Sequence, residues 1–286
     1  MIGAVLIDKA AGMTSHDVVH RVRRVLAVRS AGHTGTLDPF ATGLLVVLLG
    51  AATRLARFVQ EQPKTYLATA RLGVQTDTDD LTGRVIATSA DVSTLTESHV
   101  RDALVGLLGT QLQRPPAFSA KHVAGERSYR RARRGEAPAL RPTSVTVHHI
   151  ELVQYRPPEL TFRAIVSAGT YLRAMARDLG ERLRVGAHLI QLRREAIGAL
   201  LVDQAVPLET LTRESVFPAQ RILSHLPAIT LDPDGSRDIR HGRRVRSADD
   251  VPREGEAIAL LEGGDLIAIA RAEDGWLQPT VVLEHG

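Results

Sequence analysis

The chain has 286 residues, of which 44% are hydrophobic and 24% charged, and its formal net charge is +4. This length and apolar content suit one large domain and a smaller one. The absence of cysteine from the sequence excludes disulfides, thiolate nucleophiles, iron–sulfur clusters and cysteine-ligated zinc. No stretch reaches the roughly 18 apolar residues of a membrane span and no charged leader precedes the first apolar run, so a soluble, cytoplasmic protein is expected.

The first fifty residues predict a strand, a helix, a loop and a buried element. The run "AVLIDK" (4–9) is typical of a short strand, and the next helix begins at Thr14 or Ser15, with Asp17 in its first turn. Its predicted buried face consists of Val18, Val19, Val22, Val25 and Leu26. The stretch His33–Gly43, "HTGTLDPFATG", is predicted as a loop that leads into the apolar run Leu44–Gly50.

The middle of the chain mixes strand and helix patterns. Strands are predicted over 64–73, 144–155 and 159–169, and helices over 96–109 and 170–183. Because these elements lack a regular strand–helix–strand rhythm, we expect an α+β fold with a mixed, largely antiparallel sheet flanked by helices.

The pattern changes after residues 224–235. Short strand-like runs separated by glycines then predict a small all-β module of about sixty residues. We therefore expect a large domain over 1–226 and a small one over 227–286.

Basic residues cluster in two segments. Arg114–Arg141 contains eight basic and two acidic residues, and Arg237–Arg246 contains five arginines and one aspartate. Arginine clusters suit phosphate groups, so the sequence favours a nucleic acid or another extended polyanion as partner. A solvated arginine-rich helix is the alternative interpretation.

Several familiar sites are missing from the sequence. The glycine-rich stretch lacks the features of a phosphate loop or a dinucleotide-binding motif. The acidic run Thr76–Asp80, "TDTDD", does not fit a calcium loop and is interpreted as an exposed acidic turn. His148 and His149 lie in a strand pattern that points them to opposite faces, so they are interpreted as ordinary strand residues. We expect neither a metal nor a cofactor.

Asp38 is the candidate for chemistry. An aspartate before proline often makes only a turn. Here, however, Gly35 and Gly43 allow a close backbone approach, Pro39 stiffens the backbone, and His33 supplies an aromatic, hydrogen-bonding ring.

The stretch "GHTGTLDPFATG" resembles the catalytic motif of the TruB family, the tRNA pseudouridine-55 synthases. Further blocks resemble the family in the same order along the chain: 8–19, 64–83, 115–135, 167–180 and 187–194. One departure is Ala10, where the family usually has proline after the lysine. The C-terminal module resembles the PUA-type RNA-binding appendix of the family.

The resemblance implies an isomerase that converts uridine 55 in the T-arm loop of tRNA to pseudouridine, by base flipping and without a cofactor. Asp38 is then the catalytic carboxylate, whether it attacks the base, attacks the sugar or acts as a base in a glycal route. The resemblance further implies that Tyr66 stacks on the base and that Arg173 pairs with Asp38. Tyr171 and Leu192 border the uracil, and His33 contacts the flipped region.

The basic side chains predicted to contact the RNA backbone are Lys121, Arg127, Arg130, Arg131, Arg133 and Arg134. We expect a monomer with no obligate protein partner. Two alternatives stay open at this point: a non-catalytic RNA-binding protein, and a glycoside-cleaving or nucleoside-cleaving hydrolase that uses Asp38 with Asp77 or Asp79.

Overall fold

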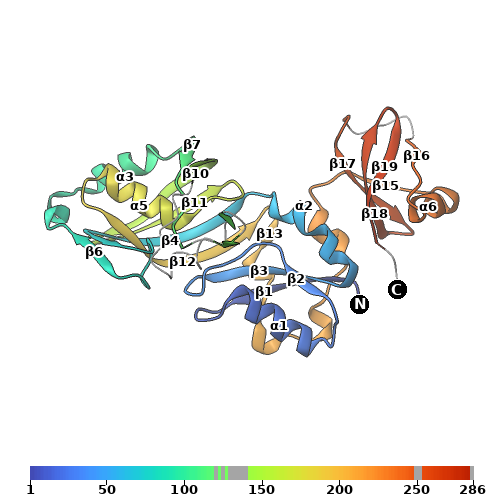
Figure 1. Cartoon of the computed structure of the whole chain (residues 1–286), viewed down its shortest axis with the longest axis horizontal. Coiled ribbons are helices and arrows are strands. Elements are labelled where there is room, and N and C mark those ends of the chain that lie inside the picture. The colour runs from blue at the N-terminus through green and yellow to red at the C-terminus, as the bar shows by residue number, and fades with distance from the viewer. Residues whose placement is uncertain (119–121, 124–125, 128–140, 248–252, 284–286) are drawn as a thin grey trace. The chain divides into compact units, whose positions relative to one another are not determined.

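The computed structural model describes residues 1–118, 122–123, 126–127, 141–247 and 253–283. The chain forms two compact units (Figure 1). Unit 1 comprises Met1–Pro39, Gly43–Glu61 and Ile197–Gly286, and unit 2 comprises Phe40–Thr42 and Gln62–Ala196. Both units combine helices with mainly antiparallel strands, which confirms the α+β prediction.

The N-terminal part of unit 1 combines short and long strands with one covering helix. Its elements are β1 (Gly3–Lys9), α1 (Ser15–Val25), β2 (Ala31–His33) and β3 (Thr42–Leu49). β1 and β3 pair antiparallel along their whole length, with Gly3 opposite Leu49. The short β2 also pairs with β3, and β14 (Val206–Pro207) pairs with β1 in parallel.

Helix α1 begins as predicted. Thr14 is the N-cap: its hydroxyl accepts the backbone N–H of Asp17, whose carboxylate accepts the backbone N–H of Thr14. The buried face contains the expected apolar residues except Val25, which is 45% exposed. Val25 is the last helical residue and lies at the edge of the apolar stripe, so the prediction of its burial was wrong.

Unit 2 is built on a sheet in which β7, β10, β11 and β4 pair antiparallel. Its strands are β4 (Lys64–Leu72), β5 (Val74–Thr76), β6 (Val85–Thr88), β7 (Gly109–Gln113), β8 (His122–Val123), β9 (Glu126–Arg127), β10 (Thr143–Arg156), β11 (Glu159–Val166) and β12 (Ala187–Ile197). The strand order is β12-β4-β11-β10-β7, and β5 pairs with β6 and β8 with β9. Side chains along β4 alternate between buried and partly exposed, as a strand with one covered face requires.

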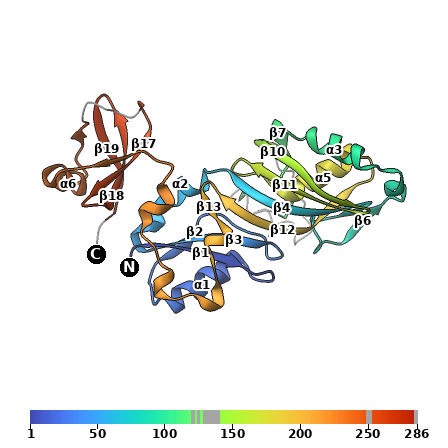
Figure 2. The ribbon, with the colours of Figure 1, turned by 180° about the vertical axis from the view of Figure 1, so that it is seen from behind.

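In the described part of unit 2, two helices cover this sheet. Helix α3 (Glu97–Val105) packs on β10, and α5 (Leu172–Arg182) packs on β4 and on α3. Figures 1 and 2 show both helices beside β10, β11 and β4 from opposite sides. All five elements predicted between residues 64 and 183 are thus present.

The C-terminal part of unit 1 forms a second sheet. Its elements are β15 (Ala228–Thr230), α6 (Pro233–Arg240), β16 (Val245–Arg246), β17 (Ala257–Glu262), β18 (Asp265–Glu273) and β19 (Trp276–Val282). The strand order is β15-β17-β18-β19-β16. The sequence predicted the three long strands but not helix α6. The domain boundary after residue 226 stays a prediction.

The core of unit 1 joins its N-terminal and C-terminal parts. One apolar cluster includes Leu44, Val46 and Leu48 of β3 together with Leu266 and Ile269 of β18. α2 (Ala56–Gln60) and the short helices Gly50–Leu55 and Ala219–Leu223 contribute to the same cluster.

The remaining short elements are β13 (Leu200–Leu201) and the 3-10 helices Asp91–Thr94, Val202–Gln204, Leu208–Thr210 and Arg213–Ser215. In the described part of the chain, no helix is long and apolar enough to span a membrane.

Candidate active site

Asp38 lies half-buried on the loop between β2 and β3. Gly43, at the start of β3, has a φ of 99°, a conformation that residues with a Cβ rarely adopt. The chain therefore enters β3 through a backbone conformation that favours glycine, whereas the close approach of a ligand at Gly35 and Gly43 stays a prediction.

The backbone on both sides of Asp38 is tethered to the N-terminal segment. Before it, the Leu37 N–H donates to the Ser15 hydroxyl at 2.9 Å, and that hydroxyl donates to the Leu37 carbonyl at 3.2 Å. After it, the Pro39 carbonyl accepts the Gly12 N–H at 2.8 Å and the Lys9 Nζ at 3.3 Å. These contacts hold the residues directly before and after Asp38.

Lys9 is an unusual residue because its charged amine is almost completely buried. Besides Pro39, its Nζ donates to the carbonyls of Ala10 at 2.9 Å and Met13 at 2.8 Å. A buried cation needs such acceptors. The sequence signal was a lysine two residues after the apolar run Ala4–Ile7 of β1, to which we assigned no role.

His33 ends β2 opposite Val47 of β3. Its Nδ1 accepts the backbone N–H of Gly35 at 3.3 Å, which fixes the ring against the first turn of the Asp38 loop. His33 and Asp38 both belong to unit 1.

The other predicted site residues belong to unit 2. Tyr66 lies on β4 opposite Ala164 of β11 and is 8% exposed. Leu192 is buried on β12, the strand next to β4. Tyr171 is the half-buried N-cap residue of α5. The roles of these residues toward a substrate stay predictions.

Arg173 sits in the first turn of α5 with only 5% of its surface exposed, so it is not a surface arginine. Its guanidinium donates to the carbonyls of Thr78 at 3.0 Å and Phe118 at 2.9 Å. It also forms an ion pair of 3.3 Å with the buried carboxylate of Asp80. The predicted pairing of Arg173 with Asp38 stays a prediction.

The acidic run Thr76–Asp80 is not the exposed turn that we expected, and only Asp77 is exposed. Asp80 is buried, and one carboxylate oxygen accepts the Thr82 N–H at 2.9 Å while the other faces Arg173. The Asp79 carboxylate contacts Arg177 of α5 at 3.1 Å. Burial raises the pKa of Asp79 to about 6, although Arg177 and Arg173 both lower it.

Gln113 is a second residue that the sequence analysis missed. It lies buried at the end of β7, and its side-chain amide spans the backbone of Tyr171. The Gln113 Oε1 accepts the Tyr171 N–H at 2.9 Å, and the Nε2 donates to the Tyr171 carbonyl at 3.1 Å. The side-chain amide thereby pairs with the Tyr171 backbone as a neighbouring strand would, and it fixes the start of α5. No local pattern in the sequence reveals this contact.

Most of the first basic segment, 114–141, lies outside the described residues, whereas the second, 237–246, is described throughout. Lys121, Arg130, Arg131, Arg133 and Arg134 lie outside the described residues, and for Arg127 only the backbone of β9 is described. In the second segment, Arg237, Arg240 and Arg243 form ion pairs with Asp234, Glu262 and Asp238. Arg244 and Arg246 lie over the ring of Trp276, at 4.5 and 5.3 Å from its centre.

The histidine pair of β10 was considered in the sequence as a metal site. His148 and His149 are both exposed, and a β-bulge interrupts the expected alternation between Val147 and His149. Among the described residues, no three histidine, aspartate or glutamate side chains gather closely enough to hold a metal ion.

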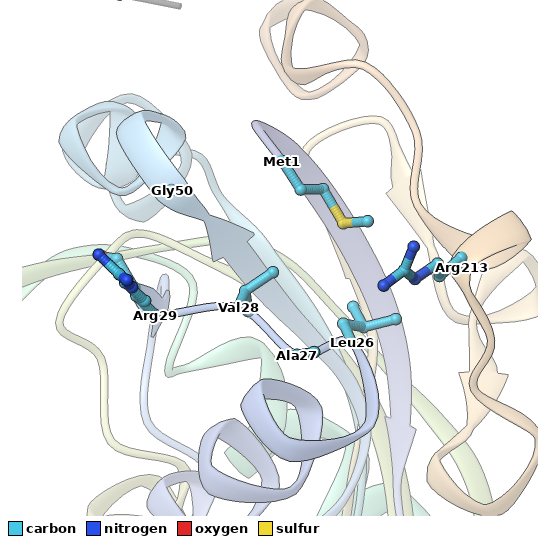
Figure 3. Close-up of a pocket in the computed structure, with 8 residues that line it drawn as sticks. Met1, Leu26, Ala27, Val28, Arg29, Gly50 and Arg213 are labelled. Atoms are coloured by element: carbon cyan, nitrogen blue, oxygen red, sulfur yellow. The ribbon is translucent and has the colours of Figure 1, made fainter. Parts of the chain in front are cut away.

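Unit 1 also has a pocket of about 470 Å³ beside the end of α1. In Figure 3, the Arg213 side chain extends towards Met1 and Leu26 across this pocket. None of the six predicted site residues that the structure describes lines it, so it is separate from the Asp38 loop.

Comparison with protein families gives three matches in chain order. The model of the TruB family pseudouridylate synthase N-terminal domain matches residues 23–172. The model of the tRNA pseudouridylate synthase B C-terminal domain matches residues 173–229, and that of the pseudouridine synthase II TruB C-terminal domain matches residues 227–283.

Curated relatives match along nearly the whole chain. The tRNA pseudouridine synthase B of Thermobifida fusca (strain YX) is 41% identical, and the match covers 98% of each chain. The tRNA pseudouridine synthase B of Aquifex aeolicus (strain VF5) is 38% identical over 99% of this chain and 100% of its own.

Among solved structures, the H/ACA RNP bound to a substrate RNA containing 2′-deoxyuridine includes a similar chain, with a TM-score of 0.76 and 22% identity. That match covers 99% of this chain and 85% of the other. The archaeal box H/ACA sRNP Nop10–Cbf5 complex gives a TM-score of 0.74 at 24% identity, over 98% of this chain and 85% of the other. At these identities the likeness concerns the fold.

Proposed function

Since the chain belongs to the TruB family of tRNA pseudouridine synthases, we propose that it isomerises the uridine at position 55, in the T-arm loop of tRNA, with Asp38 as the catalytic carboxylate. The observation that carries this proposal is the anchoring of the Asp38 loop. Ser15 and Lys9 hold the backbone on either side of an aspartate that belongs to the family's motif. Such rigidity suits a group that must meet a reacting atom.

The reaction needs no external reactant. The bond between N1 of the uracil and C1′ of the ribose breaks, the base turns, and a bond forms between C5 and C1′. C5 loses its proton and N1 gains one, so substrate and product are isomers. Asp38 assists either by covalent attack or as a base.

The target base must leave its stack to reach Asp38, which costs on the order of a few kcal/mol. In our proposal, Tyr66 provides a replacement stacking surface, and Tyr171 and Leu192 border the uracil. Arg173 pairs with Asp38 and keeps the carboxylate oriented. His33, held by the Gly35 N–H, contacts the flipped region.

The affinity for tRNA comes mainly from phosphate contacts. We assign these to the basic residues of segment 114–141, which include Lys121, Arg127, Arg130, Arg131, Arg133 and Arg134. The C-terminal module, residues 227–286, adds a PUA-like RNA contact. There Arg244 and Arg246 stack on Trp276, while three neighbouring arginines are paired with carboxylates. In this proposal the enzyme acts as a cytoplasmic monomer without a protein partner.

The test is tritium release from a tRNA transcript labelled at uracil C5, together with mapping of any pseudouridine. We expect the wild type to release label at position 55 and Asp38→Asn to bind the transcript without releasing label. Asp77→Asn is the matched control, because Asp77 is an exposed carboxylate of unit 2. It should react like the wild type.

Two results would contradict the proposal. If the wild type binds tRNA tightly but releases no label, the chain is an RNA-binding protein without this activity. If free uracil appears in place of pseudouridine, the chain is a hydrolase. Salt dependence of binding gives a separate check, since phosphate contacts predict a steep loss of affinity as salt rises.

A further inference from the structure

The solvent-facing side of α1 carries two histidines one helical turn apart. His16 and His20 are both exposed, and their separation of four residues puts them on the same face. Their Nε2 atoms lie 3.1 Å apart, with ring centres at 4.6 Å and ring planes at 77° to one another. The two rings therefore meet at their Nε2 atoms beside the helix.

This geometry fits the coordination of one metal ion. Histidine nitrogens bind zinc at about 2.0–2.1 Å. Two nitrogens 3.1 Å apart, each at that distance from an ion, subtend an angle of roughly 98° at the ion. This value lies between the ideal octahedral and tetrahedral angles, so the spacing of the two nitrogens suits one ion, which the rings reach by turning their lone pairs towards it.

A hydrogen bond between the two rings is the other way to account for the same distance. It requires one ring to donate from Nε2 and the other to accept there. That bond holds the rings together before metal binding and gives way when both nitrogens turn their lone pairs to an ion. The hydrogen-bonded pair therefore preorganises the metal site.

Neighbouring charges have opposing effects on a bound cation. The Asp17 carboxylate lies next to His16 in the sequence, and its hydrogen bonds with Thr14 lower its pKa, which keeps it negative near neutral pH. Arg24, one turn after His20, disfavours a cation. The two nitrogen ligands must therefore provide most of the affinity.

We propose that His16 and His20 form a two-histidine site for a borderline divalent transition metal such as Zn²⁺, Ni²⁺ or Cu²⁺. Imidazole suits these ions, whereas Mg²⁺ and Ca²⁺ require oxygen ligands. Water or an external donor completes the coordination. Among these ions, Cu²⁺ binds most tightly, as the usual order of complex stability requires.

The site lies on the turn of α1 that anchors the Asp38 loop. Ser15, directly before His16, makes both hydrogen bonds to Leu37 from the buried side of the helix. A metal that bridges His16 and His20 ties together the first two turns of α1 on the exposed side. Because the ion binds this arrangement only in the folded chain, it stabilises the native state.

The experiment uses the full chain without an affinity tag, stripped of metal with a chelator, and titrates it calorimetrically with NiCl₂, ZnCl₂ or CuCl₂. We expect one equivalent to bind, and either His16→Gln or His20→Gln to weaken binding by on the order of tenfold or more. His241→Gln is the control, since His241 is an exposed histidine whose Nδ1 lies 2.8 Å from the Arg237 carbonyl. It should leave binding unchanged.

Two further measurements keep the test independent of folding and of the proposed activity. Far-ultraviolet circular dichroism of each variant must match the wild type, because both positions are exposed. Saturating Ni²⁺ should raise the Tm of the wild type by a few degrees but not that of His16→Gln. The proposal is overturned if either single variant binds as the wild type does, if His241→Gln weakens binding equally, or if MgCl₂ binds as tightly.

Discussion

Replacing Gln113 with leucine tests how the start of α5 is held. Leucine has a similar volume but cannot replace either hydrogen bond to Tyr171. The change removes two hydrogen bonds in a part-buried setting, each worth about 1 kcal/mol, while the Tyr171 carbonyl keeps the Met175 N–H at 3.1 Å. We therefore expect the free energy of unfolding to fall by about 2 kcal/mol.

The matched control is Gln111→Leu on the same strand. Gln111 is less buried, and its Nε2 makes one hydrogen bond, to the Leu107 carbonyl at 2.9 Å. This variant should lose at most about 1 kcal/mol. Urea denaturation of both variants, with the slope of the transition checked for each, measures the difference.

Activity provides a second readout for the same change. Arg173 follows Tyr171 by two residues, so a loosened start of α5 shifts the guanidinium away from Asp80. We expect Gln113→Leu to lower the rate of tritium release well below that of Gln111→Leu, when both are assayed at a temperature at which they are folded. Equal stability and equal rates in the two variants would refute the argument that Gln113 positions α5.

Three other changes follow from the buried charges. The raised pKa of Asp79 means that its stabilising contribution is complete only below its ordinary pKa of 3.8 and is lost as the pH rises from there through about 6. Asp79→Asn should therefore gain up to about 3 kcal/mol relative to the wild type between pH 4 and 7 in urea titrations, and a constant difference would contradict this. Lys9→Met leaves three carbonyls without their charged donor and should destabilise unit 1 by about 3 kcal/mol, measured by thermal unfolding. Asp80→Asn removes the 3.3 Å ion pair with the buried Arg173 guanidinium and should lower the free energy of unfolding by about 1.5–3 kcal/mol, whereas the exposed control Asp77→Asn stays within about 0.5 kcal/mol.

Local patterns in the sequence predicted most elements of this fold. The alternation in 64–73 and the capping signal at Thr14 depend on neighbouring residues only, and both gave the observed β4 and α1. Helix α6 had a local signal as well, because Asp232 caps it and Pro233 opens it. We interpreted that stretch only through its five arginines, as a contact for a polyanion.

The site features that the sequence analysis missed depend on residues far apart in the chain. Asp79 and Asp80 look like a solvated turn because the arginines that pair with them lie on α5, more than ninety residues later in the chain. The role of Gln113 likewise depends on Tyr171, which lies on a separate element. Such pairings follow from the packing of α5 onto the sheet, which no window of neighbouring residues contains.

Unit 1 is assembled from the two ends of the chain, so it cannot complete its core until synthesis is nearly finished. Leu44, Val46 and Leu48 of β3 share their core with Leu266 and Leu283, which the ribosome adds more than two hundred residues later. At about 5–20 residues per second, this delay lasts on the order of ten to forty seconds. Unit 2, most of which is one continuous segment, is synthesised during that interval, while the face of β3 that carries Leu44, Val46 and Leu48 lacks the part of its core that β18 supplies. Because an incompletely buried apolar strand is prone to aggregation, this face of β3 needs protection until β18 has been made.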